Sequence, residues 1–493
     1  MAGHDYSRAA MSTSVAPNVI GLDAEPAVPF DRPRRKMLLL ALGLALIVVA
    51  NHLLRHNLEH ATLPPYPIFP DNKVPLTWQL LLPMDIGAAE NAYHAKGSYH
   101  WFTTGMLFVK IAEQYFTPNS VFYACNALLI ISSFVCTWLM FRSPVFSYSV
   151  TICMAFGTHF HWVYVCSPIT AFYVYVIYLE ANLLCLYKAL RTGTRGWKVA
   201  FAATLILLAL NHEQWLSYFA FLIPACGFIW LWAGKAAPEL RPRVLFVAVF
   251  SGLLAVGYLA IRLQYGEQQS RASDEDVMIF VYSSKVMAAE DFFSNVLSLL
   301  YMAISNYFPP WLVGSNSLYL YGREGVIAAQ DGYHPQQTQL VAMHHLFYWY
   351  FFAGITFAVF VYFLMRNART ALRQGSTRHL HLTLCMLLIA AGFAIHALIK
   401  YRPYLSVPLL TYKCMTSNVG VAYLIGYLLM YGRQTIRRRW LSGALVAVVW
   451  ATIVYSGLTR PAYLSHLAAE VGLSPVPDPL RKLRHHVESP RNP

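Results

Sequence analysis

The feature that most constrains this chain is a series of apolar runs, each about long enough to cross a lipid bilayer. Of 493 residues, 57% are hydrophobic and only 12% are charged, and the mean hydropathy is +0.44. A soluble domain has about a quarter charged residues. Because hydrocarbon offers no partner to backbone polar groups, only helices and closed barrels span it, and the alternating strands of a barrel are absent. The sequence therefore predicts an all-α, polytopic helical membrane protein.

The apolar runs predict about 11 transmembrane helices, with the N-terminus inside and the C-terminus outside. The spans are expected at 37–54, 121–141, 146–165, 169–187, 199–210, 216–232, 244–263, 346–364, 382–398, 417–430 and 441–458. We interpret residues 1–36 as a disordered cytoplasmic arm, 37–458 as one transmembrane domain, and 459–493 as an outer tail.

The basic residues fall on one side of this topology. Dense clusters of Lys and Arg occur at 32–36, 188–198, 235–243, 366–378 and 433–439. Such clusters mark the cytoplasmic loops of membrane proteins and attract anionic headgroups. The formal charge of +14 is thus explained by membrane lipids as partners, without nucleic acid.

Two large loops are expected on the outer side, at 55–120 and 264–342. Helical spacing of apolar residues in the first loop predicts helices that lie on the membrane surface. In the second loop, the stretch 292–308 is apolar but interrupted by Ser and Asn. We interpret it as an interfacial helix; if it crosses the membrane instead, the topology of everything downstream inverts.

Candidate functional residues collect on the outer side. Asp85 and Glu90 lie in the first loop and are the candidate catalytic carboxylates, with Asp85 as general base. Glu90 and His94 are four residues apart and share a helical face, so they form a supporting or metal-binding pair. The further candidates for substrate or phosphate binding are His212 and Glu213 after the fifth span, and Lys400, Arg402 and Lys413 in a late loop.

The acidic and basic candidates lie in different loops, and each type suits a different part of a transfer reaction. A carboxylate at a membrane face can take a proton from an acceptor hydroxyl or amine. Arg and Lys can neutralise a phosphate leaving group as negative charge develops on it. Acidic groups from one loop and basic groups from a distant loop therefore suit a substrate with an anionic leaving group.

Two further features lie inside the apolar segments. Glu180 falls within the fourth span, where a carboxylate is costly and needs a partner. The eight cysteines form no CxxC pair, so we expect packed core thiols rather than a zinc site or a disulfide framework.

Together these features resemble the integral-membrane glycosyltransferases of the GT-C fold, which use polyprenyl-phosphate-linked sugars. The similarity begins with a first span, a long outer loop with an acidic residue, and surface helices that end near the run GSYHWFTTGMLFVKIAEQYFTPNSVFYACNALLI, which starts at Gly97. It continues with two spans joined by the basic loop 188–198, and KYRPYLSVPLLTY, which starts at Lys400, looks like the late Arg-Tyr-Leu-x-Pro loop of the family. The resemblance covers residues 37–430.

The resemblance implies transfer of a sugar from a polyprenyl-phosphate-linked donor to a lipid, glycan or protein acceptor. The active site is expected on the periplasmic face of a bacterial-type inner (plasma) membrane, or on the lumenal face in a eukaryote. No cofactor is required by the sequence, although a divalent metal is compatible with it. The alternatives are a transporter or flippase of a lipid-linked saccharide, or a ligase or polymerase of surface polysaccharide.

The predicted topology is testable by cysteine accessibility. We expect Lys96→Cys and Ala272→Cys to react with a membrane-impermeant thiol reagent applied from the outer side, because both lie in predicted outer loops. Arg195→Cys, in the basic loop, serves as the control and should react only from the cytoplasmic side. Reaction of the Lys96 and Ala272 variants from the cytoplasmic side alone would rule out this topology.

Overall fold

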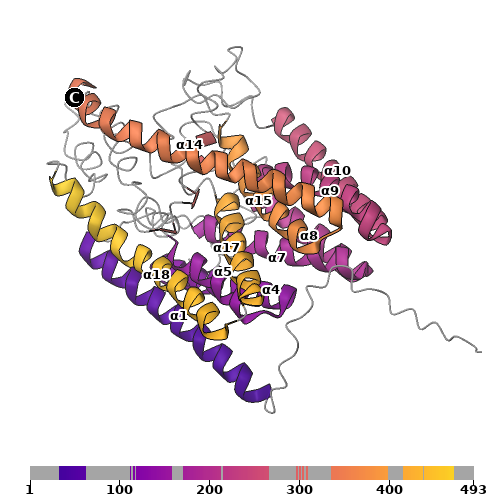
Figure 1. Cartoon of the computed structure of the whole chain (residues 1–493), viewed down its shortest axis with the longest axis horizontal. Helices are drawn as coiled ribbons and strands as arrows, with labels where there is room; N and C mark the ends of the chain where they lie inside the picture. The colour runs from indigo at the N-terminus through magenta and orange to yellow at the C-terminus, as the bar shows by residue number, and fades with distance from the viewer. Residues whose placement is uncertain are drawn as a thin grey trace, which may run out of the picture.

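The protein is a bundle of long helices (Figure 1). The structure, a computed structural model, describes residues 33–62, 112, 115–116, 118–157, 170–211, 215–265, 296–297, 299–300, 303–304, 307–308, 335–397, 415–436 and 438–470. The α-helices in these ranges are α1 (Pro33–Thr62), α4 (Pro118–Phe141), α5 (Pro144–Phe156), α7 (Thr170–Thr192), α8 (Arg195–Asn211), α9 (Trp215–Ala236), α10 (Arg241–Tyr265), α14 (Pro335–Gln374), α15 (Thr377–Ala397), α17 (Met415–Thr435) and α18 (Arg439–Glu470), with a 3-10 turn, η2 (Pro238–Leu240).

Each of these α-helices overlaps one predicted span, and the described residues contain no strand. The prediction of an all-helical membrane protein is therefore confirmed at this level. In the described part of the chain, 5 helices are long and apolar enough to cross a membrane; the count of about 11 crossings stays a prediction. These five segments are Tyr123–Phe141, Tyr173–Thr192, Trp215–Ala236, Pro238–Ala260 and Arg439–Thr459.

Several helix ends differ from the sequence-based boundaries. The helix α14 continues through the basic segment 366–374, which the sequence analysis treated as a loop, because this segment is rich in the helix formers Ala, Arg, Leu and Gln. The helix α18 likewise extends to Glu470. By contrast, α5 stops at Phe156, because Gly157 has an extended backbone (φ −61°, ψ 131°).

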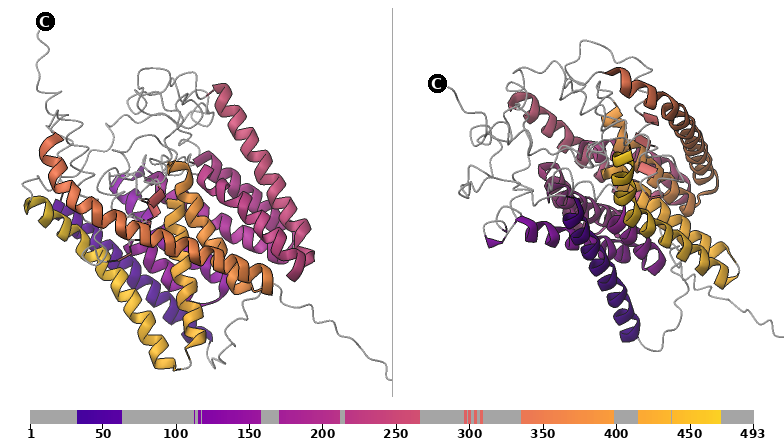
Figure 2. Two further views of the ribbon diagram at one scale, coloured as in Figure 1. Left: turned by 45° about the horizontal axis from the view of Figure 1, so that its top comes forward. Right: turned by 90° about the vertical axis from the view of Figure 1, so that its left-hand side faces the viewer.

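The helices form a buried centre and an exposed periphery. In the centre, α7 packs on α4, α8 and α17, and α17 packs on α15, α5 and α7. In Figure 1, α10 lies at the right-hand edge of the bundle and α18 at its lower left-hand edge, and α14 lies at the right-hand edge in the right-hand view of Figure 2. Their outward faces carry large apolar side chains exposed to the surroundings, including Leu253, Phe351 and Val448. Apolar residues that cannot be buried in protein are expected to face lipid in a membrane helix.

Three tight turns at one end of the bundle reverse the chain between long helices. The residue that follows α4, α7 and α14 has a left-handed backbone in each case: Arg142 (φ 55°), Gly193 (φ 68°) and Gly375 (φ 65°). Each of these residues donates its N–H to the carbonyl four residues earlier, at 2.9 Å, which ends the helix. Glycine adopts this conformation without strain, which explains its use at two of the turns.

The basic clusters gather at that same end. Arg243, in the first turn of α10, donates from Nη1 to the carbonyl oxygens of Leu190 (2.8 Å) and Arg191 (2.7 Å) at the end of α7. The guanidinium of Arg378, in the first turn of α15, lies 4.8 Å from the ring centre of Tyr431, near the end of α17.

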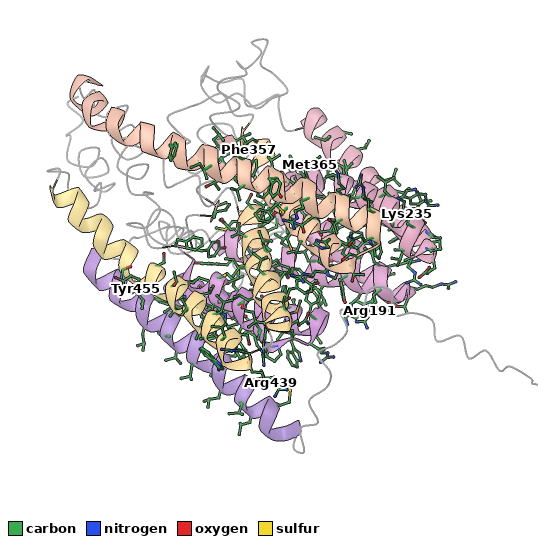
Figure 3. The ribbon with its side chains drawn as sticks, in the orientation of Figure 1. Arg191, Lys235, Phe357, Met365, Arg439 and Tyr455 are labelled. Carbon is green, nitrogen blue, oxygen red and sulfur yellow. The ribbon has the colours of Figure 1, made fainter. Side chains whose placement is uncertain are left out.

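The first turns of α1 and α5 lie at the same end of the bundle. Tyr148, near the start of α5, donates to the Leu40 carbonyl near the start of α1 at 2.8 Å. Figure 3 shows Arg191, Lys235 and Arg439 at the lower and right-hand ends of their helices. We call this end of the bundle the basic end.

Eight residues of the stretch 292–308 are described, and five of them are buried. The described residues Val296, Leu299, Leu300, Ala303 and Tyr307 are all buried, and their spacing of three and four residues places them on one side of a helix. The Tyr307 hydroxyl donates to the Asn418 carbonyl of α17 at 2.9 Å. The interpretation of 292–308 as an interfacial helix stays a prediction.

A close contact between the backbones of α15 and α17 allows their packing to be tested. At Gly392 of α15, an added Cβ would lie 2.3 Å from the Ser417 backbone nitrogen of α17, so backbone would have to shift. We expect Gly392→Ala to destabilise the protein by about 1–3 kcal/mol, the usual cost of overpacking. Gly354→Ala is the matched control, because a Cβ there meets nothing within 4 Å. The measurement is thermal unfolding of both variants in one detergent, and equal melting temperatures would contradict the packing.

Candidate functional site

The residues that the sequence analysis proposed for chemistry lie outside the described part of the chain. This applies to Asp85, Glu90 and His94, to His212 and Glu213, and to Lys400, Arg402 and Lys413. Their roles therefore remain predictions. The helix ends that flank their segments are described, however, and these ends can be located in the bundle.

These flanking ends lie opposite the basic end. The helix α8 ends at Asn211, α9 begins at Trp215, and α17 begins at Met415. The Tyr175 hydroxyl, in the first turns of α7, lies 2.8 Å from the Thr416 hydroxyl. Because α7 and α17 both end with basic turns, their first turns meet at the other end, which we call the loop end.

A second group of contacts joins α1 to the loop end. The buried Asn51 of α1 donates from its amide to the Ala155 carbonyl in the last turn of α5. Its side-chain oxygen accepts a hydrogen bond from the Asn126 amide of α4. The Ala155 carbonyl lies in the last turn of α5, where the helix itself supplies no donor, so Asn51 satisfies a carbonyl that α5 leaves open.

The carboxyl group of Glu180 lies deep inside the bundle. It is 0% exposed, near the middle of α7, and the Ser133 hydroxyl of α4 donates to its Oε2 at 2.7 Å. The Ser133 hydroxyl is also 2.8 Å from the Leu129 carbonyl, so its single proton has two acceptors. The Oε1 atom is buried and accepts no hydrogen bond from a described residue.

This arrangement leaves Glu180 poorly compensated for a membrane interior. No Lys, Arg or His in the described ranges forms an ion pair with it, although a buried carboxylate is costly without a partner. One free oxygen in an enclosed site can accept a proton or a ligand hydroxyl. The sequence-based view of Glu180 as an unusual residue is therefore supported, while its partner Ser133 was not foreseen.

Asn182, on the opposite side of α7, shows how a buried polar group is satisfied completely. Its Nδ2 donates to the Phe201 carbonyl at 2.9 Å and to the Thr204 hydroxyl at 2.8 Å in α8. Its Oδ1 accepts from the Tyr218 hydroxyl of α9 at 2.8 Å. One side chain thus links three helices. No local motif marks Asn182, because the pattern exists only once α8 and α9 pack on α7.

Polar groups without partners accumulate at the loop end of α8 and α9. Neither polar atom of the Asn211 amide is hydrogen-bonded to a described residue, and the same holds for Trp215 Nε1 and Ser217 Oγ. All three residues are buried. Unpaired buried polar atoms are uncommon in native proteins and suit a site that a polar ligand or water completes. The sequence analysis identified His212 and Glu213 beside them but missed these three.

Metal and thiol chemistry receive no support from the described residues. Within the described ranges, no group of three or more His, Cys, Asp or Glu side chains could hold a metal ion. The six described cysteines are buried, as the sequence predicted for packed core thiols: Cys125, Cys136, Cys153, Cys185, Cys226 and Cys385.

Comparisons with known proteins found no matching family model, no matching curated protein and no matching solved structure.

The contrast between Glu180 and Asn182 leads to a prediction about stability. We expect Glu180→Leu to unfold at the same temperature as the native protein or higher, because an apolar residue replaces a costly carboxyl and Ser133 keeps the Leu129 carbonyl as acceptor. We expect Asn182→Leu to lose about 1–3 kcal/mol for each buried group left unpaired. The measurement is thermal unfolding in detergent. A Glu180→Leu loss as large as that of Asn182→Leu would mean that the carboxyl is a structural element.

Proposed function

We propose that this protein is an integral-membrane glycosyltransferase that transfers a sugar from a polyprenyl-phosphate-linked donor. The reaction takes place at the loop end, which faces outward across a bacterial-type plasma membrane. Asp85 acts as the general base toward the acceptor, with Glu90 and His94 beside it. Arg402, with Lys400 and Lys413, holds the donor phosphate, and His212 and Glu213 contribute to substrate binding.

One observation carries the proposal: the basic turns of the described helices meet at one end, and the segments with the candidate residues are attached at the other. Positive clusters favour the cytoplasmic side of a membrane, so the loop end is expected outside. An outer active site suits a lipid-linked donor, because sugar nucleotides are cytoplasmic substrates while a lipid carrier presents its sugar beyond the membrane. The unpaired polar atoms of Asn211, Trp215 and Ser217 add hydrogen-bonding capacity at this end.

A transporter or flippase of a lipid-linked saccharide is the second candidate, and Glu180 favours it. Transporters place ionisable groups near the middle of the membrane, and Glu180 is such a group. A polysaccharide ligase or polymerase shares the donor and the membrane side with the first proposal. The substitution Glu180→Gln separates transport from transfer, because it keeps the shape of the side chain and removes its ability to ionise.

The proposal predicts different effects for different charges. In liposomes that contain a polyprenyl-phosphate-linked sugar pool, Asp85→Asn should lower transfer at least about 100-fold, the usual contribution of a general base, with donor binding unchanged. Arg402→Ala should weaken binding of a polyprenyl-phosphate analogue, and Arg402→Lys should weaken it less, because Lys lacks the two parallel hydrogen bonds of Arg. Glu180→Gln should leave transfer within a few-fold.

Glu239→Gln is the matched control, since Glu239 is an exposed carboxylate at the basic end. It should change neither transfer nor donor binding. If Asp85→Asn retains transfer within a few-fold, Asp85 is not the base, and Glu90 or Glu213 takes its place. Equal affinity of the three Arg402 proteins would remove the phosphate assignment. Loss of saccharide transport in Glu180→Gln, with no transfer in any protein, would establish the transporter instead.

A further inference from the structure

An apolar groove of about 300 Å³ runs along the outer surface between α9 and α10. Its floor is buried and consists of Leu222, Cys226, Val244 and Ser251. Its rim is exposed, and one wall comes from each helix: Ile223, Gly227 and Trp230 from α9, and Leu245 and Ala248 from α10. A concave site with an apolar floor on a lipid-facing surface is suited to a hydrocarbon chain.

The groove follows a helical stripe that begins at the basic end. On α10, Arg241, Leu245, Ala248 and Ser251 are spaced by three or four residues and so share one face. At 1.5 Å per residue, the ten steps from Arg241 to Ser251 cover about 15 Å. That length is about half of the roughly 30 Å hydrocarbon thickness of a bilayer, so the stripe from Arg241 to Ser251 is about as long as one leaflet is thick.

A cation lies beside the groove, next to a lining residue near the basic end. The guanidinium carbon of Arg241 lies 5.2 Å from the ring centre of Trp230, in a cation–π contact. The absence of a side chain at Gly234 makes room for it, because an added Cβ would lie 2.1 Å from the Arg241 Nη2 atom. Arg241 donates no hydrogen bond to a described residue, and its Nε is among the buried polar atoms without a partner.

The charges around Arg241 favour an anion. Lys235 is exposed in the last turn of α9, and Figure 3 shows it at the right-hand edge of the bundle. The carboxylate nearest to Arg241 along the sequence is that of Glu239, which is exposed and forms no ion pair with a described basic residue. A guanidinium that stacks on an aromatic ring keeps its N–H edge free to bind two oxygens of a phosphate.

We propose that this groove binds one acyl chain of an anionic phospholipid from the leaflet at the basic end, with the lipid phosphate on Arg241. The acyl chain follows the groove from Trp230 to Ser251, and the headgroup lies at the level of Arg241 and Lys235. This lipid differs from the proposed sugar donor, whose phosphate is expected at the loop end. The proposal requires a membrane at the basic end and does not depend on which reaction the protein catalyses.

Fluorescence quenching tests separately whether the groove holds an acyl chain and whether Arg241 prefers an anionic lipid. The protein is placed in phosphatidylcholine vesicles that contain either brominated phosphatidylglycerol or brominated phosphatidylcholine. Quenching of Trp230 is taken as the difference between the native protein and Trp230→Phe. We expect quenching by the brominated anionic lipid at a mole fraction about five times lower than for the zwitterionic lipid, which corresponds to about 1 kcal/mol for one basic residue near the surface.

Two substitutions distinguish binding of the lipid phosphate from binding of the acyl chain. Arg241→Gln should abolish the preference for the anionic lipid and leave quenching by both lipids equal. Gly227→Leu should lower quenching by both lipids, because the new side chain fills the groove. A Cβ at Gly227 meets nothing within 4 Å, so this variant is expected to fold. Arg439→Gln is the matched control, since Arg439 is exposed and, like Arg241, is the first residue of a helix at the basic end.

Three results would overturn the proposal. Unchanged quenching in Gly227→Leu would show that no acyl chain occupies the groove. An equal loss of lipid preference in Arg241→Gln and Arg439→Gln would mean a general attraction of the basic surface. A dimer that dissociates in Gly227→Leu would identify the groove as an interface between two copies of the chain. Melting temperatures of each variant show whether a change in quenching reflects unfolding.

Discussion

The constraint on which this structure depends is the exclusion of charge from hydrocarbon. A guanidinium at the centre of a bilayer costs at least several kcal/mol, so the basic turns of a membrane bundle are held at its surface. Here the basic turns also bind one another's helices. Arg243 donates two hydrogen bonds to the last carbonyls of α7, which lie at the negative end of that helix dipole, and Arg378 stacks on Tyr431. Once these ends meet, every hairpin that leaves them must place its other end, and its loop, on the opposite side.

Inside the bundle, polar side chains serve two different purposes. Asn182 uses both donors and its acceptor to join α7, α8 and α9, and Asn51 completes the end of α5. Such saturated networks make the packing specific, because any shift of a helix leaves a polar group unpaired. Glu180 and the Asn211–Trp215–Ser217 group are not saturated by described residues. Since burial without partners costs stability, sites of this kind are retained where function requires them.

The periphery follows a different rule from the centre. The helices α10 and α18 expose large apolar side chains over much of their length, which a soluble protein avoids and a bilayer favours. Along α9 and α10 this surface is hollowed, and a cation lies beside the groove. The described helices thus have three distinct surfaces: a basic end, an apolar side that is exposed to the surroundings, and a loop end to which the segments with the residues proposed for chemistry are attached.

The amino-acid sequence alone was sufficient to predict the all-helical class and a helix at each described position, because hydropathy is a property of each segment considered by itself. The positions of all the described helices and the buried state of the described cysteines follow from that pattern. Helix ends were less predictable, as the helical basic segment of α14 shows, since charged residues with high helix propensity extend a helix beyond the hydrocarbon.

The significance of Glu180 was visible in the sequence, because a lone carboxyl in an apolar run is rare. Its contact with Ser133, the three-helix role of Asn182, the unpaired group at Asn211 and the groove beside Arg241 were decided only by tertiary structure. Each joins residues that are far apart in sequence or on different helices, and these distances are determined by the packing of side chains between helices, which no single segment encodes.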